Sequence, residues 1–532
     1  MAYTDPDAHK QHCFNYNGLN KLPKKGCKWE DEGKAGTGIY QTPDPYCDAN
    51  PFITGAKYNE DDLACMTPYQ ILNNRNYRKE WMAAFIVNAE SPEDIKHSIE
   101  FAKTHNLGIS VINTGHEMVD RNAGPGPNSL LIRTTCFRDW QARPNEKPEE
   151  DDSWDGGYAD VGAGLSFGKN FWPALKNGKG LYLLAADVNR EIVGGTCRSV
   201  GIVGWTMGGG RGWTSPLYGL GVDQLLNVKL VTADGKFVNA NANNEYKDLF
   251  YAVKGGGFGF GIIHSIRIKL HKPKCYDGPT MKDCYNNFIA NWTGPYDVES
   301  TPNYVKKITR TYLKWSKKNR PNWNANYQLR YHNATRTYSI YIYANYFHTS
   351  GSLTSFSSFP TAFDSSDFDK DRIKFDSKTG KPSTGRNSHK FYQIVTDKYF
   401  CEVFPDYKNG SNCTDNPWHL ERWLGSVRFL VNGSVANDTN DFVDKLVDSW
   451  QPCCDSTAYS PCASGYQIHA DLPQINLKTG KGINASPSPI SHGFRTAQWQ
   501  VFNFDVNSNH VNLTDRQKDE WMHSVLAPIM YK

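Results

Sequence analysis

Glycine is concentrated in two short stretches of this 532-residue chain. Ten of the 28 positions from Gly194 to Gly221 are glycine, and so are five of the seven from Gly255 to Gly261. Glycine at this density is typical of backbone that takes positive φ or approaches a ligand closely, although tight loops between strands are an alternative explanation. Neither stretch has the GxGxxG spacing after a first strand or the GxxxxGK[ST] spacing. A Rossmann or P-loop nucleotide site is therefore disfavoured.

The composition of the chain excludes several classes of protein. Its length predicts two or three domains, each with a core of its own. A hydrophobic share of 39% and an aromatic share of 13% exclude a disordered chain. No run of about 20 apolar residues is present, so no membrane span is expected. A net charge of +4 over this length builds no basic face, and nucleic acid is therefore not an expected partner.

Cysteine usage indicates an oxidising compartment. The chain has 13 cysteines and no paired CxxC set. The close group of His9, His12 and Cys13 stands alone in a polar terminus, so no metal site is expected. Eight Asn-x-Ser/Thr sites, all after residue 290, support a secreted glycoprotein with disulfide bonds. Residues 1–25 contain no apolar signal core, so either a signal peptide has been removed or the sequence is a fragment.

Local patterns divide the chain into four parts and predict an α+β protein. These parts are a disulfide-rich segment (1–77), a region of mixed strands and helices (78–271), an antiparallel sheet with helices (272–492), and a last strand and helix (493–532). The elements expected after residue 272 are a helix over 305–315 and strands over 338–343, 426–430, 466–471 and 499–504, with a surface loop over 350–392.

Two local signals are strong in the second part. A strand over 83–87, a helix opened by Ser91 as N-cap with Pro92 in its first turn, and a strand over 107–111 predict a βαβ unit. Further along, Asp234-Gly235 separates two alternating segments and predicts a hairpin.

A polar loop follows the strand that ends near Val111. Asn113, Thr114 and Gly115 can direct successive N–H groups into one concavity, which suits a pyrophosphate. The next residue is His116, which on its own is more often an ordinary loop histidine than a functional one.

Together these segments resemble the berberine bridge enzyme-like FAD-linked oxidases, whose FAD-binding domain is of the vanillyl-alcohol oxidase type. Four segments match the family in order: the βαβ unit at 81–111, the histidine loop at 113–116, the cysteine-bearing glycine segment at 194–223, and the segment Asp-Leu-Phe-Tyr-Ala-Val-Lys-Gly-Gly-Gly at 248–257. The resemblance implies a two-subdomain FAD-binding domain over 78–271 and an antiparallel-sheet substrate domain with helices.

The resemblance implies FAD attached through two covalent bonds, one to His116 and one to Cys197. A disulfide is the alternative for Cys197, but removing one cysteine from 13 leaves an even number for pairing. Further contacts to the cofactor are implied for Asn113, Thr114, Gly115, Glu117, Arg121, Val200, Gly201, Gly204, Gly208, Tyr218, Gly219, Asp223, Gly256 and Ile262.

The implied activity is that of a secreted oxidase. Hydride would pass from an alcohol or sugar C–H to the covalently bound flavin, and O2 would reoxidise the flavin to give H2O2. The partners would then be O2 and a small-molecule substrate, with a carbohydrate as the first candidate. An oxidase of secondary metabolites and a non-catalytic secreted binding protein are the alternatives.

Catalytic residues are not assigned by these patterns. Gln467, His469 and Asp471 share one face of the expected strand over 466–471 and are weak candidates, with a solvent-facing edge strand as the alternative. Asp120 and Val203 depart from the residues that the family often has near the cofactor. A closing segment of Tyr-x-Asn type is also not found, so a truncated or degenerate C-terminus is expected. These departures favour the non-catalytic alternative.

Overall fold

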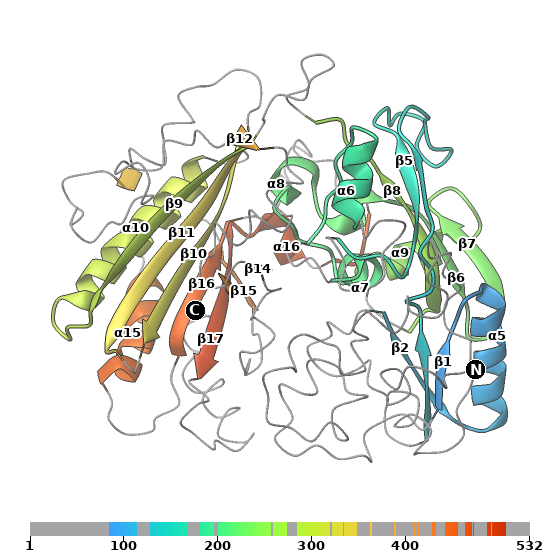
Figure 1. Ribbon diagram of the computed structural model, residues 1–532, viewed down its shortest axis with the longest axis horizontal. Helices are drawn as coiled ribbons and strands as arrows, with labels where there is room; N and C mark the ends of the chain where they lie inside the picture. Colours follow the sequence, from blue (N-terminus) through green and yellow to red (C-terminus); the bar gives the residue numbers. More distant parts are fainter. Residues whose placement is uncertain are drawn as a thin grey trace.

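Three sheets carry the fold of the computed structural model (Figure 1). The structure describes residues 85–113, 128–167, 180–195, 200–256, 259–273, 285–319, 322–332, 335–347, 362–363, 388–389, 408–409, 412–413, 428–431, 442–455, 463–470, 472, 487–490 and 492–506. The segment 1–77, residues 507–532 and most of the loop expected at 350–392 lie outside this range. Within it, no helix has the length and apolar character needed to cross a membrane.

The first sheet confirms the predicted βαβ unit. Strand β1 (Phe85–Asn88), helix α5 (Pro92–Thr104) and strand β2 (Gly108–Ile112) follow one another in the chain. Strand β3 (Ser129–Arg133) lies between β1 and β2 and runs parallel to both. Ser91 caps α5 as predicted, because its side chain accepts the N–H of Asp94 while the Asp94 carboxylate accepts the N–H of Ser91.

The second sheet has five antiparallel strands in the order β4-β5-β8-β6-β7. These strands are β4 (Trp140–Arg143), β5 (Tyr158–Gly162), β6 (Leu225–Val231), β7 (Phe237–Asn241) and β8 (Ile262–Lys269). Asp234 and Gly235 form the predicted hairpin between β6 and β7, and Gly235 takes φ 79°. The short helices of this region are α6 (Leu181–Asp187), α7 (Ile202–Met207), α8 (Ser215–Tyr218), the 3-10 helix η3 (Gly221–Gln224) and α9 (Lys247–Val253).

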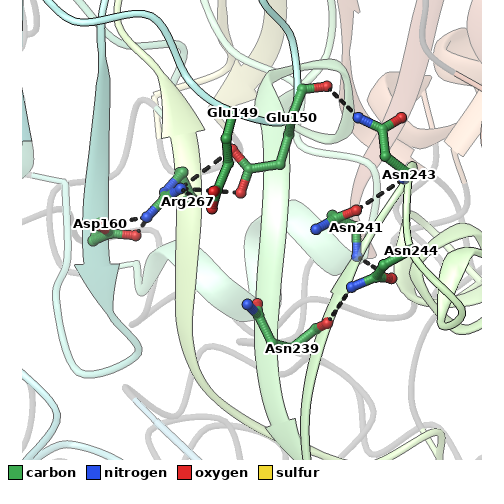
Figure 2. A network of polar contacts seen from close by, with 8 residues as sticks. All are labelled: Glu149, Glu150, Asp160, Asn239, Asn241, Asn243, Asn244 and Arg267. Carbon is green, nitrogen blue, oxygen red and sulfur yellow. Dashed lines mark hydrogen bonds and ion pairs between the residues drawn. The ribbon is translucent and has the colours of Figure 1, made fainter.

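Arg267 on β8 connects the acidic loop before β5 to this sheet through ion pairs (Figure 2). The Arg267 guanidinium donates to both Asp160 oxygens at 2.9 and 3.1 Å, and to the Glu150 carboxylate at 3.1 Å. Asn243, next to β7, donates to the backbone carbonyl of Glu150 at 2.9 Å. Because the Glu150 side chain is only 2% exposed, water screens its ion pair weakly. This network joins the loop before β5 to two other parts of the sheet.

The third sheet has seven strands in the order β12-β9-β11-β10-β16-β17-β15. They are β9 (Tyr285–Pro295), β10 (Trp323–His332), β11 (Thr337–Phe347), β12 (Ser388–His389), β15 (Arg428–Val431), β16 (Ala463–His469) and β17 (Trp499–Val506). Helices α10 (Thr301–Lys318) and α15 (Phe442–Asp455) cover the face turned away from the other sheets (Figure 1). The core between this face and the helices is aromatic, with the buried Trp292, Trp323 and Trp499 from the strands and the buried Trp450 from α15.

Strict alternation along β10 separates two faces of this sheet. Trp323, Ala325 and Tyr327 join the core under the helices, so Asn324 and Asn326 belong to the opposite face. Figure 1 shows the first two sheets on the side of this opposite face, with α8 and α16 (His492–Thr496) in between. We call the face of the seven-stranded sheet that carries Asn324 and Asn326 the polar face.

Strand β16 is an interior strand of the sheet. It pairs with β10 on one side and with β17 on the other, and every described side chain from Gly465 to Ala470 is buried. The alternative of a solvent-facing edge strand over 466–471 is therefore wrong. The physical reason is tertiary, because β17 comes about thirty positions later in the chain and covers the edge that β16 would otherwise expose.

Candidate functional site

The glycine segment (194–221) contacts the polar face of the seven-stranded sheet. Arg211 Nη1 lies 2.6 Å from Nδ1 of His469 on β16. Two residues later, the carbonyl of Trp213 accepts a hydrogen bond of 2.5 Å from Asn324 on β10, and the Trp213 ring packs on Tyr343 of β11. Residues 211–213 of the glycine segment thus contact three strands of the seven-stranded sheet, β16, β10 and β11.

Packing within the protein explains part of the glycine content. A Cβ at Gly212 would overlap the carbonyl oxygen of Gly194, and one at Gly210 would meet the backbone of Gly221. Gly209 and Gly210 also have φ values of 106° and 74°, which favour glycine. At these positions the tight-loop explanation is sufficient.

Two other glycines of the segment have open space in front of them. A Cβ at Gly204 would meet no heavy atom within 4 Å, and one at Gly208 would find only backbone at 3.5 Å or more. Gly204 lies in α7 and Gly208, four positions later, is the C-cap residue of that helix, so their open sides share one face of the helix. No contact among the described residues requires glycine there, which is the pattern expected where a ligand lies against the backbone.

A row of polar side chains crosses the polar face. Asn326 on β10, His469 on β16 and Gln500 on β17 are direct cross-strand partners, and Gln467 is two positions before His469 on the same face. We call Asn326, Gln467 and Gln500 the amide patch.

Several atoms of the amide patch are buried and lack a hydrogen-bond partner among the described residues: Oδ1 of Asn326, Nε2 of Gln467, and both Oε1 and Nε2 of Gln500. A buried polar group without a partner costs about 1–3 kcal/mol, so such groups are normally satisfied by a ligand or by water. Their gathering on one face indicates a binding site for a molecule that both donates and accepts hydrogen bonds.

The structure places the predicted cofactor residues in three groups. Val200, Gly201, Gly204 and Gly208 lie at and along α7. Asn113 directly follows β2, where its Nδ2 donates to the carbonyl of Ala163 and its Oδ1 is buried without a partner among the described residues.

The third group lies at the end of the glycine segment, directly after it, or near the second glycine run. It consists of Tyr218 and Gly219 at the end of α8, Asp223 in η3, Gly256 after α9 and Ile262 at the start of β8. Thr114, Gly115, His116, Glu117, Arg121, Cys197 and Asp471 lie outside the described residues, and their roles stay predictions.

The Asp223 carboxylate is occupied by protein groups. It pairs with Arg495 of α16 at 2.6 Å and accepts the N–H of Leu220 at 2.9 Å. Arg495 also donates to Ser488, and the neighbouring Ile490 lies where a Cβ of Gly209 would be. Asp223 therefore ties the segment before β17 to the glycine segment.

Asn326 and Gln500 carry no functional signal in the amino-acid sequence. An amide on an alternating strand is the ordinary residue of a solvent-facing side, so its type alone carries no signal. The alternation of Trp323-Asn324-Ala325-Asn326-Tyr327 does assign the asparagines to one face. Only the packing of the two domains shows that this face is buried.

The buried Lys254, which lies close to Asp223 and Arg495, allows a pH-dependent test of stability. Burial lowers the pKa of Lys254 to about 8, against 10.5 for an ordinary lysine, although the Asp223 carboxylate acts in the opposite direction. The unfolded chain therefore binds more protons than the folded one between these values, and stability rises with pH across this window. We expect Lys254→Met to be more stable than the wild type at pH 7, on the order of 1–3 kcal/mol. The difference should shrink towards pH 10 in denaturant titrations, and a gap that is constant with pH would contradict it.

Comparison with known proteins identifies the domain that carries the glycine segment. A family model described as an FAD binding domain matches residues 83–241. Residues 83–241 are thus similar to FAD-binding domains. The VAO-type flavoprotein oxidase VAO615 of Thermothelomyces thermophilus is 34% identical over 203 residues, which is 37% of this chain and 32% of that protein. The FAD-linked oxidoreductase ZEB1 of Gibberella zeae is 30% identical over 220 residues, which is 40% of this chain and 35% of that protein.

Solved structures show the same fold over a longer range. The VAO-type flavoprotein MtVAO713 of Myceliophthora thermophila matches with a TM-score of 0.63 and 16% identity, covering 99% of this chain and 86% of that one. Glucooligosaccharide oxidase of Acremonium strictum matches with a TM-score of 0.55 and 17% identity, covering 84% and 79%. The resemblance to FAD-linked oxidases of the vanillyl-alcohol oxidase type is confirmed, and so is the α+β fold. The matched sequence spans about a third of the curated relatives.

The described residues fit a bound FAD. The open face at Gly204 and Gly208 lets a ligand approach the backbone of α7, and Asn113 presents a buried oxygen at the end of β2. Both features lie inside the matched domain. The contacts to the cofactor that the sequence assigns to these residues stay predictions.

Proposed function

We propose that the protein is an FAD-linked oxidase that acts on the CH–OH group of a small molecule. The observation that carries the proposal is the amide patch, which faces the FAD-binding domain with buried donors and acceptors that have no partner among the described residues. Bound FAD would supply the hydride acceptor and the site of reoxidation by O2, with H2O2 as the second product. The relatives' names, flavoprotein oxidase and FAD-linked oxidoreductase, support this activity.

The chemistry of the patch favours a substrate with several hydroxyl groups. A hydroxyl group both donates and accepts, and it can therefore satisfy the Gln467 donor and the Asn326 acceptor. A carbohydrate has this property, and the match to glucooligosaccharide oxidase supports it. A secondary metabolite with fewer hydroxyl groups is the alternative.

We further propose that His116 and Cys197 both bind the flavin covalently. The support is the match to glucooligosaccharide oxidase, whose FAD is named as 6-S-cysteinyl and 8α-N1-histidyl. The order of the two residues in this chain agrees with the resemblance.

Secretion is also part of the proposal. The 13 cysteines and eight glycosylation sites support an extracellular protein, and the disulfide bond of Cys136 agrees with an oxidising compartment. Mass spectrometry of the protein from its natural source would show whether the predicted asparagines carry glycans.

A visible spectrum followed by a peroxide assay tests the activity. The purified full-length protein should show flavin absorbance, and H2O2 should form with a member of a panel of sugars and other alcohols. A colourless protein would overturn the oxidase proposal and favour the non-catalytic alternative. A flavin-loaded protein that oxidises non-sugar alcohols and no sugar would retain the oxidase and replace the substrate class.

A further inference from the structure

A chain of two hydrogen bonds runs from the glycine segment into the amide patch. Arg211 Nη1 lies 2.6 Å from His469 Nδ1, and His469 Nε2 lies 2.8 Å from Gln467 Oε1. His469 is 9% exposed and Gln467 is 3% exposed, so water competes weakly for these groups. The three side chains come from two domains.

The chemistry of the three groups sets the direction of every hydrogen bond. A guanidinium can only donate, so Nδ1 of His469 accepts from Arg211. In the neutral ring the proton is then on Nε2, and this N–H donates to Oε1 of Gln467. The amide oxygen is thereby fixed towards His469, and the Nε2 donors must lie on the other side of the amide group. Arg211 thus determines the orientation of a group that it does not touch.

The oriented donor has no partner among the residues that the structure describes. Nε2 of Gln467 is buried on the face turned towards the FAD-binding domain, with Asn326 and Gln500 as neighbours in the amide patch. A buried amide donor left without an acceptor costs about 1–3 kcal/mol. An oxygen of a bound ligand would remove this cost.

We propose that Arg211 and His469 are positioning residues, which hold the Gln467 amide so that Nε2 donates to a hydroxyl or carbonyl oxygen of the substrate. The inference rests on the proposed function for the identity of the ligand, but the orientation of the amide does not depend on it. Because both ring nitrogens of His469 are occupied in this arrangement, His469 is not the base that removes the substrate proton.

The tautomer of His469 tests the positioning chain without any turnover. The measurement is a long-range proton–nitrogen correlation spectrum of the full-length protein with isotope-labelled histidine. The His469 signal is assigned by its loss in His469→Gln. It should report a proton on Nε2. Arg211→Met should give exchange between both tautomers, whereas Arg211→Lys, which can still donate, should restore the Nε2 form. A proton on Nδ1 in the wild type would overturn the proposal.

A matched control separates this effect from general damage to the sheet. Arg310 on α10 pairs with Asp444 at 2.6 Å on the other face of the sheet. Arg310→Met should leave the His469 signal unchanged. If it alters that signal as strongly as Arg211→Met does, the effect is structural and the positioning role is refuted.

A double-mutant cycle tests the ligand contact, with cellobiose as an uncharged disaccharide probe. Gln467→Ala should lower kcat/KM about tenfold, as expected for one lost hydrogen bond. Arg211→Met should lower it about fivefold alone but less than twofold in the Gln467→Ala background, because both act through one donor. Additive losses would overturn the coupling. If the flavin-loaded protein does not oxidise cellobiose, cellobiose is excluded as a substrate, and the His469 tautomer alone decides the positioning role. A colourless protein would refute only the proposed function.

Discussion

Replacing both His116 and Cys197 by alanine should release all of the flavin when the protein is denatured in acid. The resemblance assigns one covalent bond to each residue, so either single variant should keep its flavin through the bond that remains. The measurement is flavin absorbance in the pellet and in the supernatant after precipitation. The double variant should leave all of the colour in the supernatant, and the single variants should leave none there.

Two comparisons make this result specific. His97→Ala, at an exposed position of α5, should behave as the wild type. Complete retention of flavin by the double variant would show that other residues form the bonds. Complete release from one single variant would show that the flavin has a single attachment.

Removing the Asp223 carboxylate should cause the second large effect, on stability. Asp223 is fully buried and Arg495 is 10% exposed, so Asp223→Ala leaves a buried guanidinium without its carboxylate partner. The loss of one partner of a buried pair costs about 3–5 kcal/mol. The N–H of Leu220 also loses its acceptor. We expect a clear fall in the midpoint of thermal and urea unfolding.

A surface ion pair provides the control for Asp223. Asp234 and Lys236 approach to 2.7 Å, but both side chains are more than half exposed. Because solvent screens such pairs, Asp234→Ala should leave the unfolding midpoint close to that of the wild type. If Asp223→Ala lowers the unfolding midpoint no more than Asp234→Ala does, the Arg495 charge is not buried as described. The stabilising role of the Asp223–Arg495 pair would then be refuted.

The local elements of the first two sheets follow from neighbouring residues. Ser91, Pro92 and Asp94 predict the start of α5, because a helix cap is made by groups at most four positions apart. Asp234 and Gly235 predict the hairpin for the same reason, since the turn needs positive φ at a single residue. The βαβ pattern predicts the strands β1 and β2, but it does not predict the insertion of β3 between them.

The glycine segment shows what residue type alone does not predict. Its density predicts close approach of the backbone to another group, and this prediction is confirmed at Gly212 but stays a prediction at Gly204. At Gly212 the approaching group is the backbone of Gly194, whereas at Gly204 the space is open. Residue type cannot separate the two cases, because the neighbour comes from elsewhere in the chain.

The amino-acid sequence alone specifies the caps, the hairpin, the strand that puts Gln467 and His469 on one face, and the loops that resemble an FAD site. The tertiary structure decides that this face is buried. It also brings together Arg211 and His469 from 258 positions apart, and Asp223 and Arg495 from 272. Helix and strand periodicity report on neighbours within a turn or a strand. Partners at such distances are chosen by the packing of whole domains, and on that packing the proposed substrate contacts depend.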